Sequence, residues 1–187
     1  MEEREILKGK RVLIVDDESD ILETLEEMLD TCLIDTAPNF QTAEKFLKKN
    51  RYDIAILDIM GVRGYDLLEL CGELEIPAVM LTAHALSPEN LIKSIKKGAQ
   101  AYVPKDKITE IATYVSDVLE ACEKGAPKHG KWFSRLQPFF EKKFGSGWRD
   151  RDKDFWAVFE KTYRAKREDV EDLIADFEQA FEAVAVS

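Results

Sequence analysis

The chain has 187 residues, of which 45% are hydrophobic, enough to bury the core of one domain of ordinary size and to leave a smaller appendage. No apolar stretch is long enough for a membrane-spanning helix, and the N-terminus lacks the charged and apolar segments of an export signal, so we expect a cytoplasmic protein with no membrane partner. The 37 acidic residues exceed the 27 basic ones, and the net charge is −10.

Charge and aromatic content divide the chain near residue 125. Residues 1–125 carry the whole net charge, whereas residues 126–187 contain 12 acidic and 12 basic side chains and include every Trp. Gly125 is suited to end a helix, and Pro127 prevents its continuation. We therefore predict an N-terminal extension over 1–9, a domain over 10–124, a linker over 125–130 and a helical region over 131–187.

Before that boundary, apolar runs typical of buried strands alternate with amphipathic stretches typical of helices. The strands are predicted at 12–15, 32–37, 54–57, 78–81 and 101–103, and the helices at 19–29, 40–49, 65–74, 88–97 and 108–122. Ser87 has the character of an N-cap, Pro88 of a first-turn residue, and Gly98 of a helix end. Five strands alternating with five helices predict an α/β fold with a doubly wound, five-stranded parallel sheet.

Four of these strands run into a polar or charged residue. The first is followed by Asp16 and Asp17, the third by Asp58 and the fourth by Thr82, while the fifth leads through a proline to Lys105. Because the carboxyl ends of parallel strands lie at one edge of a sheet, we expect these side chains to share a pocket.

Three carboxylates at one edge would repel one another strongly unless a cation lay between them. Mg²⁺ fits such a site, because it is a hard ion that binds one or two carboxylates and keeps several waters. We expect Asp17, Asp58 and the backbone carbonyl of Met60 to be direct ligands. Asp16 would hold the ion through a bound water.

With its charge offset in this way, Asp58 can attack a phosphoryl donor and become an aspartyl phosphate. Lys105 would neutralise the developing negative charge, and Thr82 would donate a hydrogen bond to a phosphoryl oxygen. The sequence thus predicts a phosphoacceptor site.

Over roughly residues 10 to 123, the chain resembles the receiver domain of two-component response regulators, which has a flavodoxin-like fold. The matching residues are Asp16, Asp17, Asp58, Thr82, Ala83, Tyr102 and Lys105. The resemblance implies that a histidine kinase or a phosphotransfer protein phosphorylates Asp58, that Ala83 joins Thr82 and Lys105 in binding the phosphoryl group, and that Tyr102 is a switch residue. It also implies that the chain is not an enzyme beyond its own phosphotransfer and its loss.

Two features depart from the family pattern. The segment 59–64 is shorter than usual and lacks a proline, and Pro104 precedes Lys105 where the family commonly has a proline after the lysine. Neither change removes a reacting group. His84 and Met60 are placed to tune loss of the phosphoryl group, with a solvated loop histidine as the alternative interpretation of His84.

Phosphorylation adds about 1.5 to 2 negative charges, which should draw Thr82 and Lys105 inward. We expect Tyr102 to rotate into the space that this movement vacates. The surface formed by residues 87–97, 101–104 and 107–123 would then change shape.

The C-terminal region is predicted to be small and all-α. A first helix covers 132–144 with Pro138 inside it, and Gly145 ends it. After Trp148, a pattern with steps of three and four, as in a coiled-coil seam, is apolar at every position except Lys166. Its apolar members are Trp156, Phe159, Tyr163, Val170, Leu173, Phe177, Ala180 and Val184. They fit one helix of about 33 residues or a hairpin with a break at 166–169.

Three functions are compatible with these patterns. The favoured one is a signalling module whose tail (131–187) binds a protein target or forms a homodimer when Asp58 is phosphorylated; the aromatic stripe could instead fill a small helical core or pack on the receiver. A DNA-binding regulator is disfavoured because the tail has no net charge and no helix-turn-helix pattern. An aspartyl-nucleophile phosphatase would leave Asp58, Thr82 and Lys105 without roles.

Four further residues carry weaker predictions. Cys32, Cys71 and Cys122 have no metal-ligand spacing and lie in segments that look buried, so we expect reduced, packed thiols. His129 falls in the linker and not on a helix face, so we do not interpret it as a phosphotransfer histidine.

Overall fold

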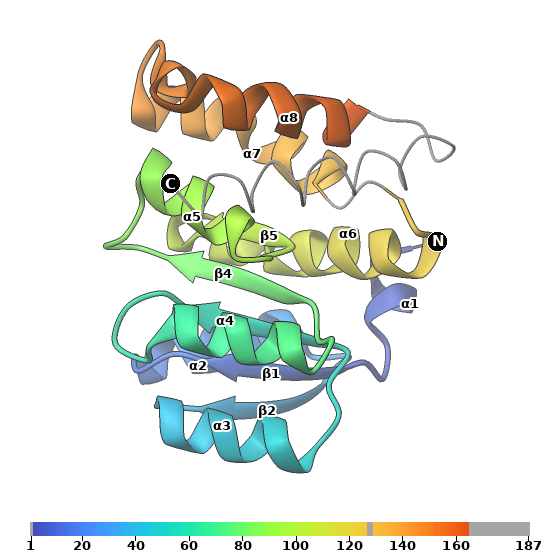
Figure 1. The fold of residues 1–187 in the computed structure, drawn as a ribbon. Helices are drawn as coiled ribbons and strands as arrows, with labels where there is room; N and C mark the ends of the chain where they lie inside the picture. Colours follow the sequence, from blue (N-terminus) through green and yellow to red (C-terminus); the bar gives the residue numbers. More distant parts are fainter. Residues whose placement is uncertain (1, 127–128, 165–187) are drawn as a thin grey trace. The chain divides into compact units, whose positions relative to one another are not determined.

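The computed structural model describes residues 2–126 and 129–164 (Figure 1). The chain divides into two compact units, one that ends at Leu119 and one that begins at Glu120. Pro127 and the segment after Arg164 lie outside the described residues, and so do the two predicted alternatives for residues 166–169. None of the described helices is long and apolar enough to cross a membrane.

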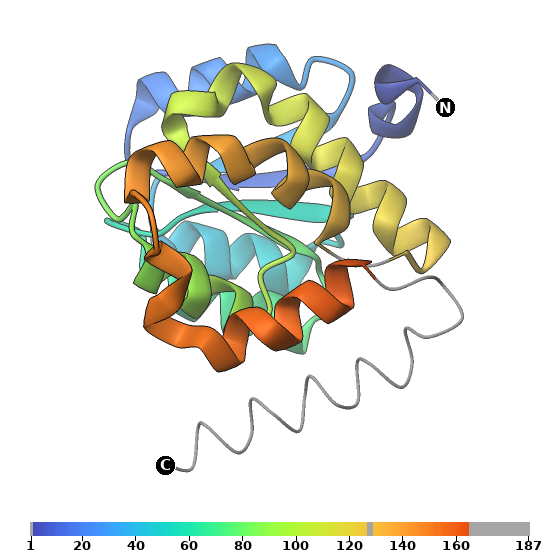
Figure 2. The same cartoon turned by 90° about the horizontal axis from the view of Figure 1, so that it is seen from above.

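The first unit is built around five parallel strands in the order β2-β1-β3-β4-β5. The strands are β1 (Arg11–Val15), β2 (Leu33–Ala37), β3 (Ile54–Asp58), β4 (Ala78–Thr82) and β5 (Ala101–Pro104). The helices are α1 (Glu3–Leu7), α2 (Ser19–Met28), α3 (Phe40–Lys49), α4 (Gly64–Glu73), α5 (Pro88–Lys96), the 3-10 helix η1 (Lys105–Glu110) and α6 (Ile111–Lys124). Helices α2 and α6 cover one face of the sheet, and α3, α4 and α5 cover the other (Figure 2). The predicted doubly wound parallel sheet is confirmed.

Burial explains why the central strands read as unbroken apolar runs. Every residue of β3 and β4 is buried, because helices cover both faces of the sheet. In β2, which lies at one edge, only Ala37 is buried. The longest apolar runs of the sequence therefore belong to strands in the interior of the sheet, such as β3 and β4.

The helix ends follow the predicted capping signals. The Ser87 side chain accepts a hydrogen bond from the backbone N–H of Asn90 at 3.1 Å, and Pro88 occupies the first position of α5. The last helix differs from the prediction, because β5 leads directly into η1 and α6 begins only at Ile111.

The N-terminal extension contains a helix, α1, that the sequence analysis did not predict. Ile6 and Leu7 of this helix are buried. The Thr113 hydroxyl of α6 donates a hydrogen bond to the Glu3 carboxylate at 2.8 Å. These contacts attach the extension to the first unit.

The second unit has an aromatic core. It contains α7 (Gly130–Phe144), the 3-10 helix η2 (Trp148–Asp152) and α8 (Lys153–Arg164). The buried side chains are Trp132, Phe133, Leu136, Phe140, Trp148, Phe155, Trp156 and Phe159. Trp156 and Phe159 of the predicted seam thus fill a small helical core. Gly145 caps α7 with a φ of 81°, and Pro138 lies inside the helix, both as predicted.

His129 belongs to this core. It lies at the N-terminus of α7, where its Nδ1 accepts a hydrogen bond from Trp132 Nε1 at 3.3 Å and its ring stacks on Phe159 with centroids 5.2 Å apart. The cysteines vary in exposure: Cys71 is buried, Cys32 is half-buried and Cys122 is exposed. The prediction of a buried thiol is therefore wrong for Cys122, which lies in the last turn of α6.

Candidate functional site

The strand order brings the predicted acidic residues together at one sheet edge. Asp16 follows β1 directly, and Asp58 is the last residue of β3, the neighbouring strand. One carboxylate oxygen from each of Asp16, Asp17 and Asp58 lies within 4.8 Å of the other two. Residues that are 42 positions apart in the chain thereby form one acidic cluster.

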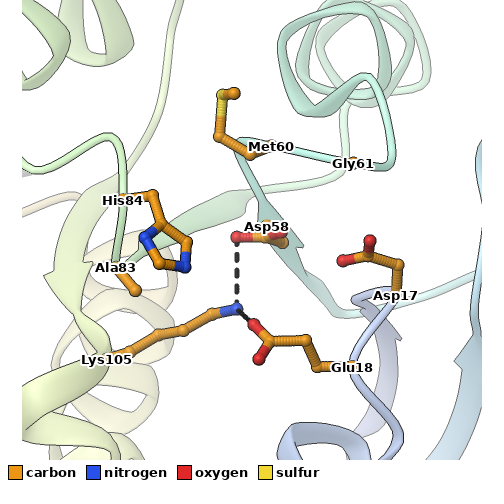
Figure 3. A pocket seen from close by; sticks show the side chains of 8 residues that line it. All are labelled: Asp17, Glu18, Asp58, Met60, Gly61, Ala83, His84 and Lys105. Carbon is orange, nitrogen blue, oxygen red and sulfur yellow. Dashed lines mark hydrogen bonds and ion pairs between the residues drawn. The ribbon is translucent and has the colours of Figure 1, made fainter.

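A pocket of about 180 Å³ opens beside this cluster (Figure 3). It is lined by Asp17, Glu18, Asp58, Met60, Gly61, Ala83, His84 and Lys105. The lining comes from the segments that follow β1, β3, β4 and β5, as expected for a parallel sheet. The predicted residues Asp17, Asp58, Met60, Ala83, His84 and Lys105 are thus brought together.

Asp16 is buried and shapes the turn into α2. Its side chain is 1% exposed, and its Oδ1 accepts a hydrogen bond from the Glu18 backbone N–H at 3.0 Å. This local bond turns the chain from the end of β1 into the helix, a common use of Asp at such positions. It leaves the side chain of the intervening Asp17 exposed toward the pocket.

Lys105 reaches three carboxylates at once. Its Nζ lies 2.8 Å from Asp16 Oδ2, 2.7 Å from Glu18 Oε1 and 3.4 Å from Asp58 Oδ1. The side chain is 8% exposed, so these contacts are shielded from water. Glu18 is a site residue that the sequence analysis missed.

Burial and charge together shift the ionisation of the site. Burial, followed by the negative charge of Asp16, raises the pKa of Asp58 to about 6, although Lys105 opposes this rise. Burial also raises the pKa of Asp16. Burial alone would lower the pKa of Lys105, but its hydrogen bonds to Asp16 and Glu18 outweigh that effect and raise it. Lys105 therefore stays charged while the acids hold excess negative charge.

The loop after β3 depends on two glycines. Gly61 has a φ of 82°, and a Cβ there would lie 2.5 Å from a carboxylate oxygen of Asp17. A Cβ on Gly64 would lie 2.1 Å from the backbone oxygen of Asp58. The shortened loop noted in the sequence is thus compatible with the site because glycine lets the backbone pass close to both acids. The same loop brings Met60, which is 56% exposed, to the rim of the pocket.

Thr82, Ala83 and His84 form the opposite side of the site. Thr82 ends β4 next to Pro104 of β5, and its Oγ1 is buried without a hydrogen bond of good geometry among the described residues. Ala83 and His84 are exposed and line the pocket. A hydroxyl whose bonding capacity is unused at a sheet edge is suited to a ligand oxygen.

Tyr102 is fully buried on β5, behind the segment that follows β4. Its hydroxyl donates a hydrogen bond to the Ala85 carbonyl at 2.9 Å, which also accepts from Asn90 Nδ2 at 2.9 Å. The Tyr65 hydroxyl of α4 lies 3.1 Å from Asn90 Oδ1. Tyr102 is thus held in a buried position in this structure, and its movement on phosphorylation stays a prediction.

The acidic cluster fits a magnesium ion. This part of the described structure holds four carboxylates, those of Asp16, Asp17, Glu18 and Asp58, and the ammonium of Lys105 pairs with three of them. Carboxylate oxygens are the ligands that Mg²⁺ prefers, and the pocket leaves space for waters and phosphate oxygens. The raised pKa of Asp58 marks a group whose ionised form lacks compensating charge.

Comparison with known proteins agrees with this geometry. The sequence model of the response regulator receiver domain matches residues 12–116, more than half of the chain. The chain belongs to the response regulator receiver family. Receiver domains typically bind Mg²⁺ at an acidic pocket, and membership implies a histidine kinase or a phosphotransfer protein as partner.

Curated relatives match the receiver part. The two-component response regulator ARR10 of Arabidopsis thaliana is 38% identical over 104 residues, which cover 52% of this chain and 19% of that protein. The heme response regulator HssR of Staphylococcus aureus is 42% identical over 100 residues, which cover 50% of this chain and 43% of that protein. The match therefore spans less than half the length of either relative.

Solved structures share the receiver fold. A CheY-like receiver domain protein from Methanospirillum hungatei is 26% identical with a TM-score of 0.58, and the match covers 64% of this chain and all of that one. DrrB of Thermotoga maritima, described as an OmpR/PhoB homolog, is 24% identical with a TM-score of 0.54, over 60% of this chain and 53% of that one. At that level of identity, DrrB supports the fold alone.

Proposed function

We propose that this receiver domain accepts a phosphoryl group on Asp58 in the presence of Mg²⁺ and thereby controls an output through its C-terminal helices. The observation that carries the proposal is the position of Asp58, whose carboxylate lies within 4.8 Å of those of Asp16 and Asp17 and 3.4 Å from the Lys105 ammonium. A phosphoacceptor needs its nucleophile, its cation ligands and a counter-charge in this arrangement.

In the transfer step, a carboxylate oxygen of Asp58 forms a bond to the phosphorus. The bond between phosphorus and the donor atom breaks, and its electron pair stays with the donor, which is a ring nitrogen when the donor is a phosphohistidine. Lys105 stabilises the negative charge on the phosphoryl oxygens, and Thr82 donates its unused hydrogen bond to one of them. Ala83 borders the space that the phosphoryl group occupies.

Asp17, Asp58 and the Met60 carbonyl would hold the magnesium ion directly, and Asp16 would hold it through water. When bound, the ion supplies the positive charge that offsets the acids and the phosphoryl oxygens. Gly61 keeps the chain close to the Asp17 carboxylate without obstructing it.

Loss of the phosphoryl group requires water to attack the phosphorus opposite the Asp58 oxygen. His84 and Met60 stand at the rim of the pocket, where they influence the access of that water. Beyond its own phosphorylation and dephosphorylation, we assign the chain no enzymatic activity.

Tyr102 is the switch residue of this proposal. Tyr102 is already buried and bonded to the Ala85 carbonyl, so phosphorylation would stabilise this position and not create it. The Asn90 side chain of α5 donates to the Ala85 carbonyl and accepts from the Tyr65 hydroxyl of α4, so it joins the segment after β4 to both helices. Phosphorylation would thus shift a pre-existing equilibrium toward this arrangement.

The output proposed for residues 131–187 is binding to a protein target or formation of a homodimer. The described aromatic side chains of α7 and α8 fill a core of their own, which makes this unit a candidate folded output module. A DNA-binding output remains the alternative, but it has no support from the tail, which carries 12 basic and 12 acidic side chains.

The proposal is tested with radiolabelled acetyl phosphate and Mg²⁺. We expect the wild type to incorporate one phosphoryl group per chain, and Asp58→Asn or removal of Mg²⁺ by a chelator to abolish incorporation. Asp66→Asn is the matched control, because Asp66 is an exposed carboxylate on α4 that pairs with Arg63. Equal labelling of wild type and Asp58→Asn would refute the proposal.

A further inference from the structure

Lys105 forms ion pairs with three carboxylates, and a phosphoryl group on Asp58 would add further acceptor oxygens beside its ammonium. Its shortest contacts are to Asp16 and Glu18, at 2.8 and 2.7 Å, which are typical of charge-assisted hydrogen bonds. The contact to Asp58 is longer, at 3.4 Å. Figure 3 shows the Lys105 ammonium between Glu18 and Asp58. In this state, the lysine is bound more closely to its two other partners than to the phosphoacceptor.

Among the described residues, the Lys105 contact with hydrogen-bond geometry is the one to Glu18 Oε1, whereas Asp16 and Asp58 lie at ion-pair distance. A phosphoryl group on Asp58 brings three strong acceptor oxygens, so a short contact from Lys105 to one of them competes with its present short contacts. The choice lies between Asp16, whose side chain is 1% exposed, and Glu18, whose side chain is 48% exposed.

Burial decides which of the two is released. An unpaired carboxylate as buried as Asp16 would be strongly unfavourable, because water cannot replace the lost ammonium. The Glu18 carboxylate has water within reach, so its release costs little. It is also the N-cap residue of α2, and its side chain makes no capping hydrogen bond. A negative charge near a helix N-terminus is favourable, so the released carboxylate stays in a suitable environment.

We propose that Glu18 is the exchange partner of Lys105: it holds the ammonium before phosphorylation, competes with the incoming phosphoryl group for it, and is released when Asp58 is modified. This inference rests on the function proposed above and concerns the regulation of the same site. Glu18 is a positioning residue, because it acts through Lys105. The competition slows phosphorylation, and repulsion between the Glu18 carboxylate and the anionic donor adds to the delay.

The kinetic test uses the full-length chain with acetyl phosphate and Mg²⁺. Glu18→Gln removes the charge and keeps the shape, and we expect it to speed phosphorylation about two- to fivefold, the range for loss of a partly exposed ion pair. Asp20→Asn is the matched control. Asp20 is an exposed carboxylate in the first turn of the same helix and has no contact with Lys105 among the described residues. We expect its rate to stay within about 1.5-fold of the wild type.

An NMR measurement distinguishes release of Glu18 from Lys105 from simple repulsion between the Glu18 charge and the anionic donor. The side-chain carboxyl carbon of Glu18, assigned by the loss of its NMR signal in Glu18→Gln, should shift when the wild type is phosphorylated or treated with beryllofluoride and Mg²⁺. The Asp20 signal should not shift. A Glu18 signal that does not move would overturn the exchange.

Each kinetic outcome has one interpretation. A faster Glu18→Gln with an unchanged Asp20→Asn supports the proposal. Equal acceleration of both variants, or a Glu18→Gln rate equal to or below that of the wild type, overturns the proposal while leaving phosphorylation of Asp58 intact. If the wild type takes up no phosphoryl group, the proposed function falls and the role of Glu18 falls with it.

Discussion

Asp58 bears an electrostatic cost in the folded chain. Its side chain is nearly fully buried, Asp16 and Asp17 lie close by, and the pKa of Asp58 is raised to about 6. A raised pKa means that the folded state binds a proton more tightly than the unfolded state, so stability falls as pH increases from about 4 to 6. The proposed phosphoacceptor therefore destabilises the fold when no cation is bound.

The variant Asp58→Asn should accordingly be more stable than the wild type at pH 7 without Mg²⁺, by about 1 to 3 kcal/mol. Below about pH 4 the two should be equally stable, because the wild-type carboxyl is then protonated in both states. Urea unfolding across this pH range measures the difference. Mg²⁺ should stabilise the wild type more than the variant, and a variant less stable than wild type at pH 7 would contradict this account.

Glycines in the loop after β3 provide a second test at this scale. Gly61→Ala has two costs: residue 61 has a φ of 82°, which alanine disfavours, and the new Cβ would clash with the Asp17 carboxylate. We therefore expect a loss of about 1 to 2 kcal/mol in the free energy of unfolding and weaker Mg²⁺ binding. Gly72→Ala is the control, because that position lies inside α4 with nothing within 4 Å of the added carbon. It should gain about 0.5 to 1 kcal/mol. Denaturant unfolding and Mg²⁺ titration report both effects, and a harmless Gly61→Ala would show that the approach to Asp17 does not matter.

The location of the site residues could be predicted from the sequence where the direction of a strand determines it. Parallel strands end at the same edge, and each of these residues ends or follows a strand: Asp16, Asp17, Asp58, Thr82 and Lys105. The partners of Lys105 were not predictable in this way. Whether it binds Glu18 more closely than Asp58 depends on differences of less than 1 Å and on side-chain rotamers that the sequence pattern does not carry.

At the scale of elements, strands and helices with a strong hydrophobic pattern were predicted, and the short helix α1 was not. β3 and β4 are apolar throughout because both faces of the sheet are covered, so their runs are unmistakable. α1 has only five residues, too few for a helical periodicity and too few to be stable alone. Its helical form depends on tertiary contacts, such as that between Glu3 and Thr113.

Removal of a buried side chain from α1 tests this dependence. Leu7 is 2% exposed, and we expect Leu7→Ala to cost about 2 to 4 kcal/mol of stability. Leu33, at the start of the edge strand β2, is 60% exposed and provides the matched control, with an expected change within about 0.5 kcal/mol. Unfolding in urea distinguishes them. Equal, small losses would mean that α1 contributes nothing to the first unit.

At the scale of the whole molecule, the acidic pocket and the aromatic core belong to different units. Every residue that lines the pocket precedes residue 119, whereas Trp132, Trp148 and Trp156, the only tryptophans in the chain, lie in the second unit. Tryptophan fluorescence therefore reports the second unit, and phosphorylation of Asp58 reports the first.

This separation predicts independent effects of mutation. Phe140 is fully buried and stacks on Phe144, so Phe140→Ala should destabilise the unfolding transition seen by tryptophan fluorescence by about 3 to 5 kcal/mol. Phe139 on the same helix is half-buried, and Phe139→Ala should have a much smaller effect. Phosphorylation rates of both variants should stay within about twofold of the wild type, because neither side chain lines the pocket. A large fall in rate for Phe140→Ala would show that the site requires the second unit.

The identity of the modified residue is the most direct test of the central claim. Borohydride reduces an aspartyl phosphate to homoserine, so treatment of the phosphorylated chain followed by peptide mass mapping identifies the acceptor. The account predicts homoserine at position 58, formed only when both Mg²⁺ and a phosphodonor are present. Homoserine at position 16 or 17, or a phosphorylated chain with no homoserine at position 58, would contradict it.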